Sequence, residues 1–193
     1  MQKLENLLSK IRKCEICTEH LPFGPHPVLQ ASQNAKILIV GQAPGIRVHE
    51  TGVPFNDPSG DRLRDWLGVD KELFYNEQKF AIVPMGFCYP GTGKSGDLPP
   101  RPECAAEWRE KLLAELNEIE LTFVIGGYAI NWHLKEQKKN TLTETVKSWK
   151  EYGDKIMVLP HPSPRNNIWL KKNPWFDAEI IPEVRDKVGK ILT

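Results

Sequence analysis

The sequence lacks a large net charge, a long apolar run and a secretory signal, and each absence excludes a class of protein. The formal net charge over 193 residues is +1, so any attraction to nucleic acid must come from a local patch rather than from the whole molecule. No apolar run approaches the roughly 20 residues of a membrane span, and residues 1–14 lack the uninterrupted apolar core of a signal peptide. We therefore expect a cytoplasmic protein without membrane contact.

Cysteine is also scarce, and four cysteines in a chain of this length favour metal ligands over a disulfide framework. Cys14 and Cys17 form a tight pair and Cys88 and Cys104 a widely spaced one, an arrangement that four-coordinate metal or cluster ligation can use. Structural zinc and free thiols are alternatives. Cys14 and Cys17 alone would also suit a redox pair, although they follow a helix instead of opening one after a strand.

Four short apolar segments that end in glycine or proline predict buried parallel strands, over residues 36–40, 80–83, 121–125 and 156–159. Apolar spacing and capping residues predict helices over residues 2–13, 59–68, 103–117 and 182–192. Strands that alternate with helices predict a three-layer α/β fold, with a central four-stranded parallel sheet flanked by helices. The size and composition suit one domain over residues 1–193.

Local signals add detail to this outline. Ser59 and Asp70 are expected to cap helices, and Thr141 with Glu144 forms a capping box ahead of another. The stretch Gly86–Pro102 contains too much glycine and proline to predict regular structure.

The predicted sheet also predicts where a ligand binds. Parallel sheets bind ligands outside the carboxyl ends of their strands. The loops after the four strands begin at Gly41, Pro84, Gly126 and Pro160. Because all four loops leave from the same edge, residues far apart in the chain are expected to meet around one pocket.

Two of these loops have compositions that suit a binding site. The glycines of Gly41–Gly45 allow close backbone approach, although such a loop is often a plain turn. Phe55, in a polar loop, is a candidate for stacking on a base. In His161–Pro164, prolines hold the histidine rigidly, which suits a donor aimed at developing charge; the alternative is a histidine satisfied by local hydrogen bonds.

Taken together, these segments resemble the uracil-DNA glycosylase superfamily, especially its iron-sulfur families four and five. Gly41–Gly45 matches the first family motif, Gly52–Phe55 its continuation, and His161–Ser163 the second motif. The stretch Thr51–Asp61 is more similar to family five. The resemblance extends from Cys14 to about Trp175.

The resemblance implies a DNA glycosylase that hydrolyses the N-glycosidic bond of uracil or another deaminated base. It implies that His161 polarises the base and that the base lies against Gly41, Ala43 and Phe55. It also implies that Ser59 and Ser163 bind DNA phosphates and that Arg165 is inserted into the DNA as a wedge. The cofactor that it implies is a [4Fe-4S] cluster bound by Cys14, Cys17, Cys88 and Cys104.

Two positions depart from the family pattern. Gln42 stands where family four has the carboxylate that orients the attacking water, and glutamine can position water but cannot accept its proton. We therefore expect Asp57 or Asp61 to supply that function. The asparagine with which family four recognises uracil falls on Pro84 or Val83, and neither side chain can hydrogen-bond a base edge.

These departures keep two other functions open. One is a nucleic-acid or nucleotide binder of the same fold with weak or no catalysis, which Gln42 and Pro84 together favour. The other is a hydrolase of free nucleosides or nucleotides, which the near-neutral net charge would suit. For the leading hypothesis, the expected partner is DNA that contains a damaged base, bound by a monomer.

Overall fold

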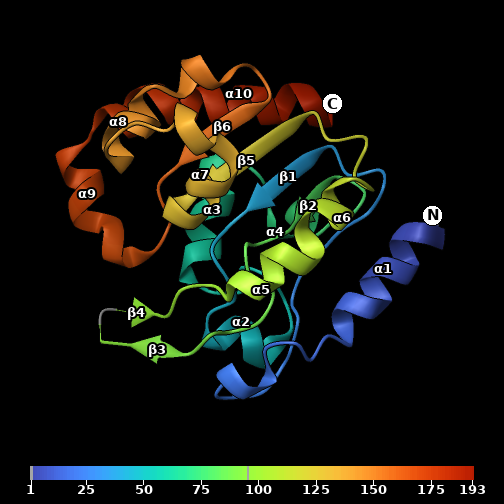
Figure 1. Cartoon of the computed structure of the whole chain (residues 1–193). Helices are drawn as coiled ribbons and strands as arrows, with labels where there is room; N and C mark the ends of the chain where they lie inside the picture. Colours follow the sequence, from blue (N-terminus) through green and yellow to red (C-terminus); the bar gives the residue numbers. More distant parts are fainter. Residues whose placement is uncertain (1, 95) are drawn as a thin grey trace.

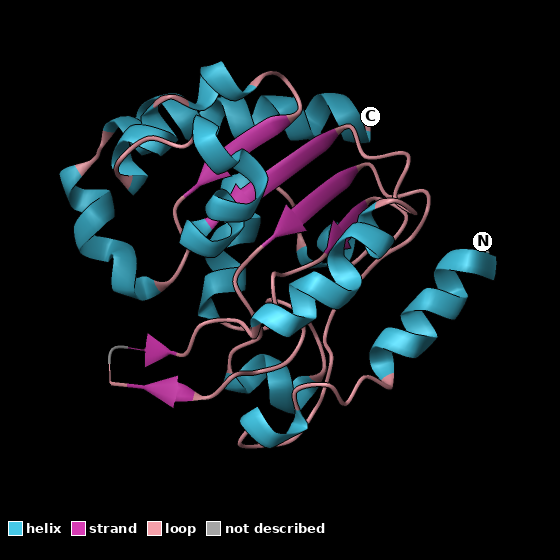
Figure 2. Ribbon diagram, viewed as in Figure 1, coloured by secondary structure: helices cyan, strands magenta, loops and turns pink. Residues whose placement is uncertain are grey.

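A four-stranded parallel sheet forms the centre of the computed structural model, which describes residues 2–94 and 96–193. The strand order is β2-β1-β5-β6, and the strands are β1 (Ile37–Val40), β2 (Phe80–Ile82), β5 (Leu121–Ile125) and β6 (Ile156–Leu159). Their residues are mostly buried because helices cover both faces of the sheet (Figure 2). The predicted α/β fold with a central four-stranded parallel sheet is confirmed.

Parallel pairing brings the four carboxyl ends to one edge of the sheet. Ile37 of β1 pairs with both Phe80 and Leu121, and Thr122 pairs with Ile156. All four arrows point the same way, and α2 and a small hairpin lie beyond their heads (Figure 1). The segments predicted to leave from one edge are therefore brought together there, although the segment after β5 is the start of a helix at Gly126 rather than a loop.

Ten α-helices are described, some continued by short 3-10 or π-helical turns. They are α1 (Gln2–Arg12), α2 (Ile46–Thr51), α3 (Pro58–Leu67), α4 (Lys71–Phe74), α5 (Pro102–Cys104), α6 (Glu110–Leu113), α7 (Gly126–Leu134), α8 (Leu142–Lys147), α9 (Asn167–Lys172) and α10 (Ile181–Leu192). In Figure 1, α5 to α7 lie in front of the sheet and α3 lies behind it. No described helix is both long and apolar enough to cross a membrane.

Several local predictions are confirmed and two are wrong. Thr141 and Glu144 form the capping box of α8, and Asp70 caps α4. Ser59, however, lies inside the first turn of α3, whose cap is Asp57, with its side chain accepting a hydrogen bond from Gly60 N. A cap accepts from the amide three residues on, so the helix begins before Ser59.

The second error concerns the stretch predicted to be irregular, which contains a hairpin. Strands β3 (Thr92–Gly93) and β4 (Gly96–Asp97) pair antiparallel. Gly91 and Gly96 adopt φ values of 98° and 135°, which are accessible chiefly to glycine. The glycines that argued against regular structure thus supply backbone conformations that the hairpin uses, before β3 and within β4.

Candidate active site

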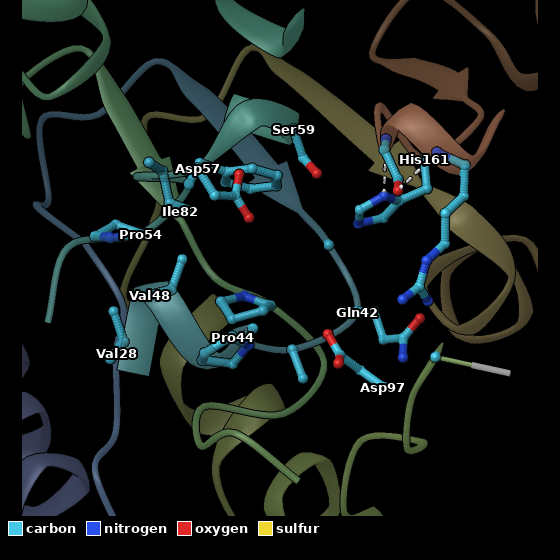
Figure 3. Close-up of a pocket in the computed structure, with 18 of the residues that line it drawn as sticks. Val28, Gln42, Pro44, Val48, Pro54, Asp57, Ser59, Ile82, Asp97 and His161 are labelled. Atoms are coloured by element: carbon cyan, nitrogen blue, oxygen red, sulfur yellow. Dashed lines mark hydrogen bonds between the residues drawn. The ribbon is translucent and has the colours of Figure 1, made fainter. Parts of the chain in front are cut away.

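A cavity of about 410 Å³ opens at the carboxyl edge of the sheet, within the size range of small-ligand sites. Its walls come from the loop after β1, the segment before α3, the end of the hairpin and the loop after β6 (Figure 3). The described residues that line it are Val28, Gly41 to Gly45, Val48, Pro54, Phe55, Asp57, Ser59, Ile82, Pro84, Gly96, Asp97, His161, Ser163, Arg165 and Asn166.

Phe55 forms one wall, in a backbone conformation that is unusual for its side chain. Its φ is 53°, in the left-handed region, which costs an aromatic residue free energy and occurs mainly at functional positions. Two contacts hold it there: Arg64 Nη1 donates to its carbonyl oxygen at 3.3 Å, and Phe74 packs edge-on at 6.3 Å between centroids. The ring also lies so near Gly41 that a Cβ at that position would be 3.3 Å from Cζ. The ring therefore lies against the loop that follows β1.

His161 immediately follows β6 and Pro160, at the opposite side of the cavity (Figure 3). The Ser163 amide donates to its Nδ1 at 3.2 Å, and the Asn166 side chain donates to its carbonyl oxygen at 2.6 Å. Burial lowers the pKa of His161, and the negative charges of Asp57 and Asp97 only oppose that effect.

These contacts determine the proton position on His161. Because an amide N–H can only donate, Nδ1 is the acceptor and is unprotonated. Because burial favours the neutral ring, the proton resides on Nε2. Figure 3 shows the ring directed into the cavity, so His161 presents an uncharged N–H donor to whatever binds there. Such a donor can stabilise negative charge that develops on a bound ligand.

Of the three residues predicted to orient water, two line the cavity and one does not. Gln42 lines it, and its Nε2 donates to the Leu98 carbonyl oxygen at 3.2 Å, leaving the amide oxygen as its other polar group. Asp57 lines it while also capping α3, with Oδ1 2.8 Å from Gly60 N. Asp61 is not among the described lining residues; its carboxylate is exposed and pairs with Arg64 at 2.6 Å.

The predicted DNA contacts lie at the cavity and its rim. Ser59 is buried within the first turn of α3, whereas Ser163 Oγ accepts from the Arg165 amide at 3.3 Å. Arg165 is exposed, and its guanidinium lies so close to Gly96 that a Cβ there would be 2.0 Å from Nη1. Ala43 also lines the cavity, as does Pro84, whereas Val83 is buried and is not among the described lining residues.

Sequence reasoning missed Asp97, the carboxylate that β4 contributes to the cavity. A Cβ on Gly45 would lie 3.5 Å from its Oδ2. The available signal was its position after β2, in the segment that leaves the same sheet edge as Gly41 and His161.

The four cysteines meet around a second, smaller cavity. Cys14, Cys17, Cys88 and Cys104 all line it, together with residues that include Phe87 and Trp108. Trp108 Nε1 donates to Cys14 Sγ at 3.2 Å, and Phe87 N donates to Cys104 Sγ at 3.3 Å. All four are free thiols. Among residues 2–94 and 96–193, no group of three or more His, Cys, Asp or Glu side chains is arranged to hold a metal ion as it stands.

Burial determines the protonation of these thiols. It raises the pKa of Cys88 to about 11 and that of Cys104 to about 12. Both are therefore protonated near neutral pH, and a metal would have to displace the protons.

A buried arginine holds the backbone at Pro84, one of the residues that line the first cavity. Arg109, in the π-helical turn after α5, is fully buried and donates to the carbonyl oxygens of Val83 at 3.3 Å and Pro84 at 3.1 Å. Its Nη2 lies 2.8 Å from His133 Nε2, and burial lowers the pKa of His133 to about 3. His133 is thus the neutral acceptor, and Arg109 fixes the backbone beneath Pro84.

Comparison with known proteins agrees with the geometry. The family model described as the uracil DNA glycosylase superfamily matches residues 29–185. The chain is also 26% identical, over 167 residues, to the type-4 uracil-DNA glycosylase of Thermotoga maritima, an alignment that covers 83% of this chain and 81% of that protein. The chain belongs to the uracil DNA glycosylase superfamily.

Proposed function

We propose that the protein hydrolyses the N-glycosidic bond between uracil, or another deaminated base, and deoxyribose in DNA. The observation that carries this proposal is the neutral Nε2 donor of His161 across the cavity from Phe55. A flipped base would stack on Phe55, and the donor would stabilise the negative charge that develops on a base oxygen as the glycosidic bond breaks.

The remaining lining residues have roles consistent with this reaction. Ser59, Ser163 and Arg165 would bind the phosphates that flank the flipped nucleotide, and Arg165 would occupy the gap that it leaves. Gln42 would orient water through its amide oxygen. Pro84 offers no side-chain hydrogen bond and its carbonyl is bound by Arg109, so it would contribute shape rather than base recognition.

The test is excision from single- and double-stranded oligonucleotides that contain uracil, hypoxanthine or xanthine, followed by alkaline cleavage of abasic sites. We expect strand breaks with at least one substrate and a loss on the order of 10²-fold or more in His161→Ala, as for removal of one preorganised donor. His20→Ala, at an exposed histidine outside the cavity, is the matched control and should retain activity.

The same preparation separates the rival functions. Binding of the oligonucleotides without strand breaks above the His161→Ala background would favour a non-catalytic binder. Release of base from free deoxyuridine or its monophosphate, but not from DNA, would favour a nucleoside or nucleotide hydrolase. Either result contradicts the glycosylase proposal.

We also propose that Cys14, Cys17, Cys88 and Cys104 hold a [4Fe-4S] cluster, with structural zinc as the alternative. The convergence of four thiols on one cavity supports a four-ligand site, and the N–H groups of Trp108 and Phe87 aimed at sulfur are the contacts that tune and orient thiolate ligands. When bound, the cluster would join the segment after α1, the loop after β2 and α5.

Absorption and metal analysis of the purified protein test this assignment. We expect a brown protein with a broad band near 400 nm and about four iron atoms per chain, as the cluster composition requires. Cys104→Ser should lose both signals. A colourless protein with one zinc ion would establish the alternative.

A further inference from the structure

We propose that Asp97 is the catalytic carboxylate that positions the attacking water and accepts its proton. The inference rests on the proposed glycosylase function and deepens it, because Gln42 cannot act as a base.

Asp97 reaches the cavity through the hairpin, far in sequence from both family motifs. It lies in β4, paired with Thr92. Figure 3 shows its carboxylate beside Gln42, directed into the cavity, and the close approach of Oδ2 to Gly45 places it over the loop after β1. The hydrogen bond from Gln42 Nε2 to the Leu98 carbonyl oxygen, at 3.2 Å, fastens the end of the hairpin to that loop.

Three carboxylates are candidates for a base, and their contacts distinguish them. Asp57 Oδ1 is engaged by Gly60 N, which fixes it as a helix cap. Asp61 pairs with Arg64 outside the cavity. Asp97 lines the cavity, and none of the described residues engages its carboxylate in a hydrogen bond or ion pair. Asp97 and His161 both line this cavity, and the negative charge of Asp97 opposes the lowering of the His161 pKa by burial.

The proposed step balances in atoms and charge. The bond between C1′ and the base nitrogen breaks, and its electron pair leaves with the base, whose oxygen accepts a hydrogen bond from His161 Nε2. The water oxygen forms the new bond to C1′ and gives one proton to the Asp97 carboxylate. That proton passes through solvent to the base anion, so the products are the free base and a sugar with a hydroxyl group at C1′.

Gln42 and Asp97 would have different roles toward the attacking water. The Gln42 amide oxygen can accept one hydrogen bond from the water, while Asp97 accepts the proton that is transferred. The two side chains come from different segments of the chain. Together they would orient the water and accept its proton, two functions that a single carboxylate on the loop after β1 would combine.

Single-turnover excision by the full-length protein, with DNA affinity measured in parallel, tests the proposal. Asp97→Asn keeps the shape of the side chain but cannot accept a proton, so we expect the rate to fall on the order of 10²–10⁴-fold with little change in DNA affinity. The excision rate of Asp57→Asn should fall much less, because asparagine also caps helices and would preserve the start of α3. Asp154→Asn, at an exposed carboxylate just before the amino end of β6, is the matched control.

Chemical rescue supplies a second readout that a purely structural role would not give. Asp97→Ala leaves space for a small carboxylate, so formate should accelerate excision by this variant, while chloride at the same ionic strength should not. Wild-type rates in Asp97→Asn, or no acceleration of Asp97→Ala by formate, would overturn the role of Asp97. Absence of excision by the wild-type protein would instead overturn the glycosylase function, and the role of Asp97 with it.

Discussion

A substitution at Gly60 tests how tightly the backbone around Phe55 is determined. A Cβ at this position would lie 1.7 Å from the Phe55 carbonyl oxygen and 2.6 Å from its carbonyl carbon, whereas real contacts of this kind essentially never fall below 3.0 Å. The carbonyl group must therefore retreat by about an ångström or more if Gly60→Ala is to fold. Its hydrogen bond from Arg64 Nη1 would be stretched or lost.

The expected cost follows from this overlap. Overpacking of a well-packed region destabilises by about 1–3 kcal/mol, and we expect Gly60→Ala to fall at the upper end because the clash is with backbone. Misplacement by about 1 Å can reduce a reaction rate on the order of 10²-fold, so excision by the folded fraction should fall by a similar factor. Gly41→Ala, whose Cβ would lie 3.3 Å from the end of the Phe55 ring, should have a smaller effect on both quantities.

Urea unfolding followed by tryptophan fluorescence measures the stability, and single-turnover excision measures the rate. Gly189→Ala is the control: its Cβ would contact nothing within 4 Å, and alanine in a helix interior should increase the free energy of unfolding by up to about 1 kcal/mol. A Gly60→Ala protein with the wild-type urea midpoint and rate would show that the Phe55 backbone is not confined as described.

Three further outcomes can be checked by urea unfolding. Burial lowers the pKa of His133 to about 3, against about 6.5 in an unfolded chain, so only the unfolded state gains this proton as pH falls below about 6.5; stability should therefore decline toward pH 3, less steeply in His133→Gln. Arg109→Met should destabilise by roughly 1–3 kcal/mol, because the Val83 and Pro84 carbonyls lose their donor. Thr141→Ala removes the cap of α8 and should cost about 1 kcal/mol.

The sheet could be predicted from sequence because its strands are continuous apolar runs that end at glycine or proline. The bounds of β5 and β6 agree with the prediction at both ends. By contrast, α2 has a single buried residue, Val48, so it shows no apolar period. Helix α7 begins directly at Gly126, where the Gly-Gly pair indicated only the end of a strand.

In the candidate site, too, some residues could be predicted from the sequence and others could not. His161 and Phe55 could be predicted because they belong to ordered motifs whose loops leave one sheet edge. Asp97 could not, because strands of two residues have no periodicity, and its closeness to Gly45 is created by tertiary packing alone. The reverse holds for Asp61, which is near Asp57 in sequence but points away from the cavity to Arg64.

Because the hairpin is short, one side of the cavity is held less firmly than the other. His161 and Gly41 adjoin strands of the central sheet, whereas Asp97 lies on a ladder of two residue pairs, which the Gln42 hydrogen bond to Leu98 ties to the loop after β1. Opening such a ladder costs far less free energy than unfolding a buried sheet. Mild denaturant or warming should therefore abolish turnover well before the tryptophan signal of global unfolding changes, so residual activity would measure the hairpin rather than the fold.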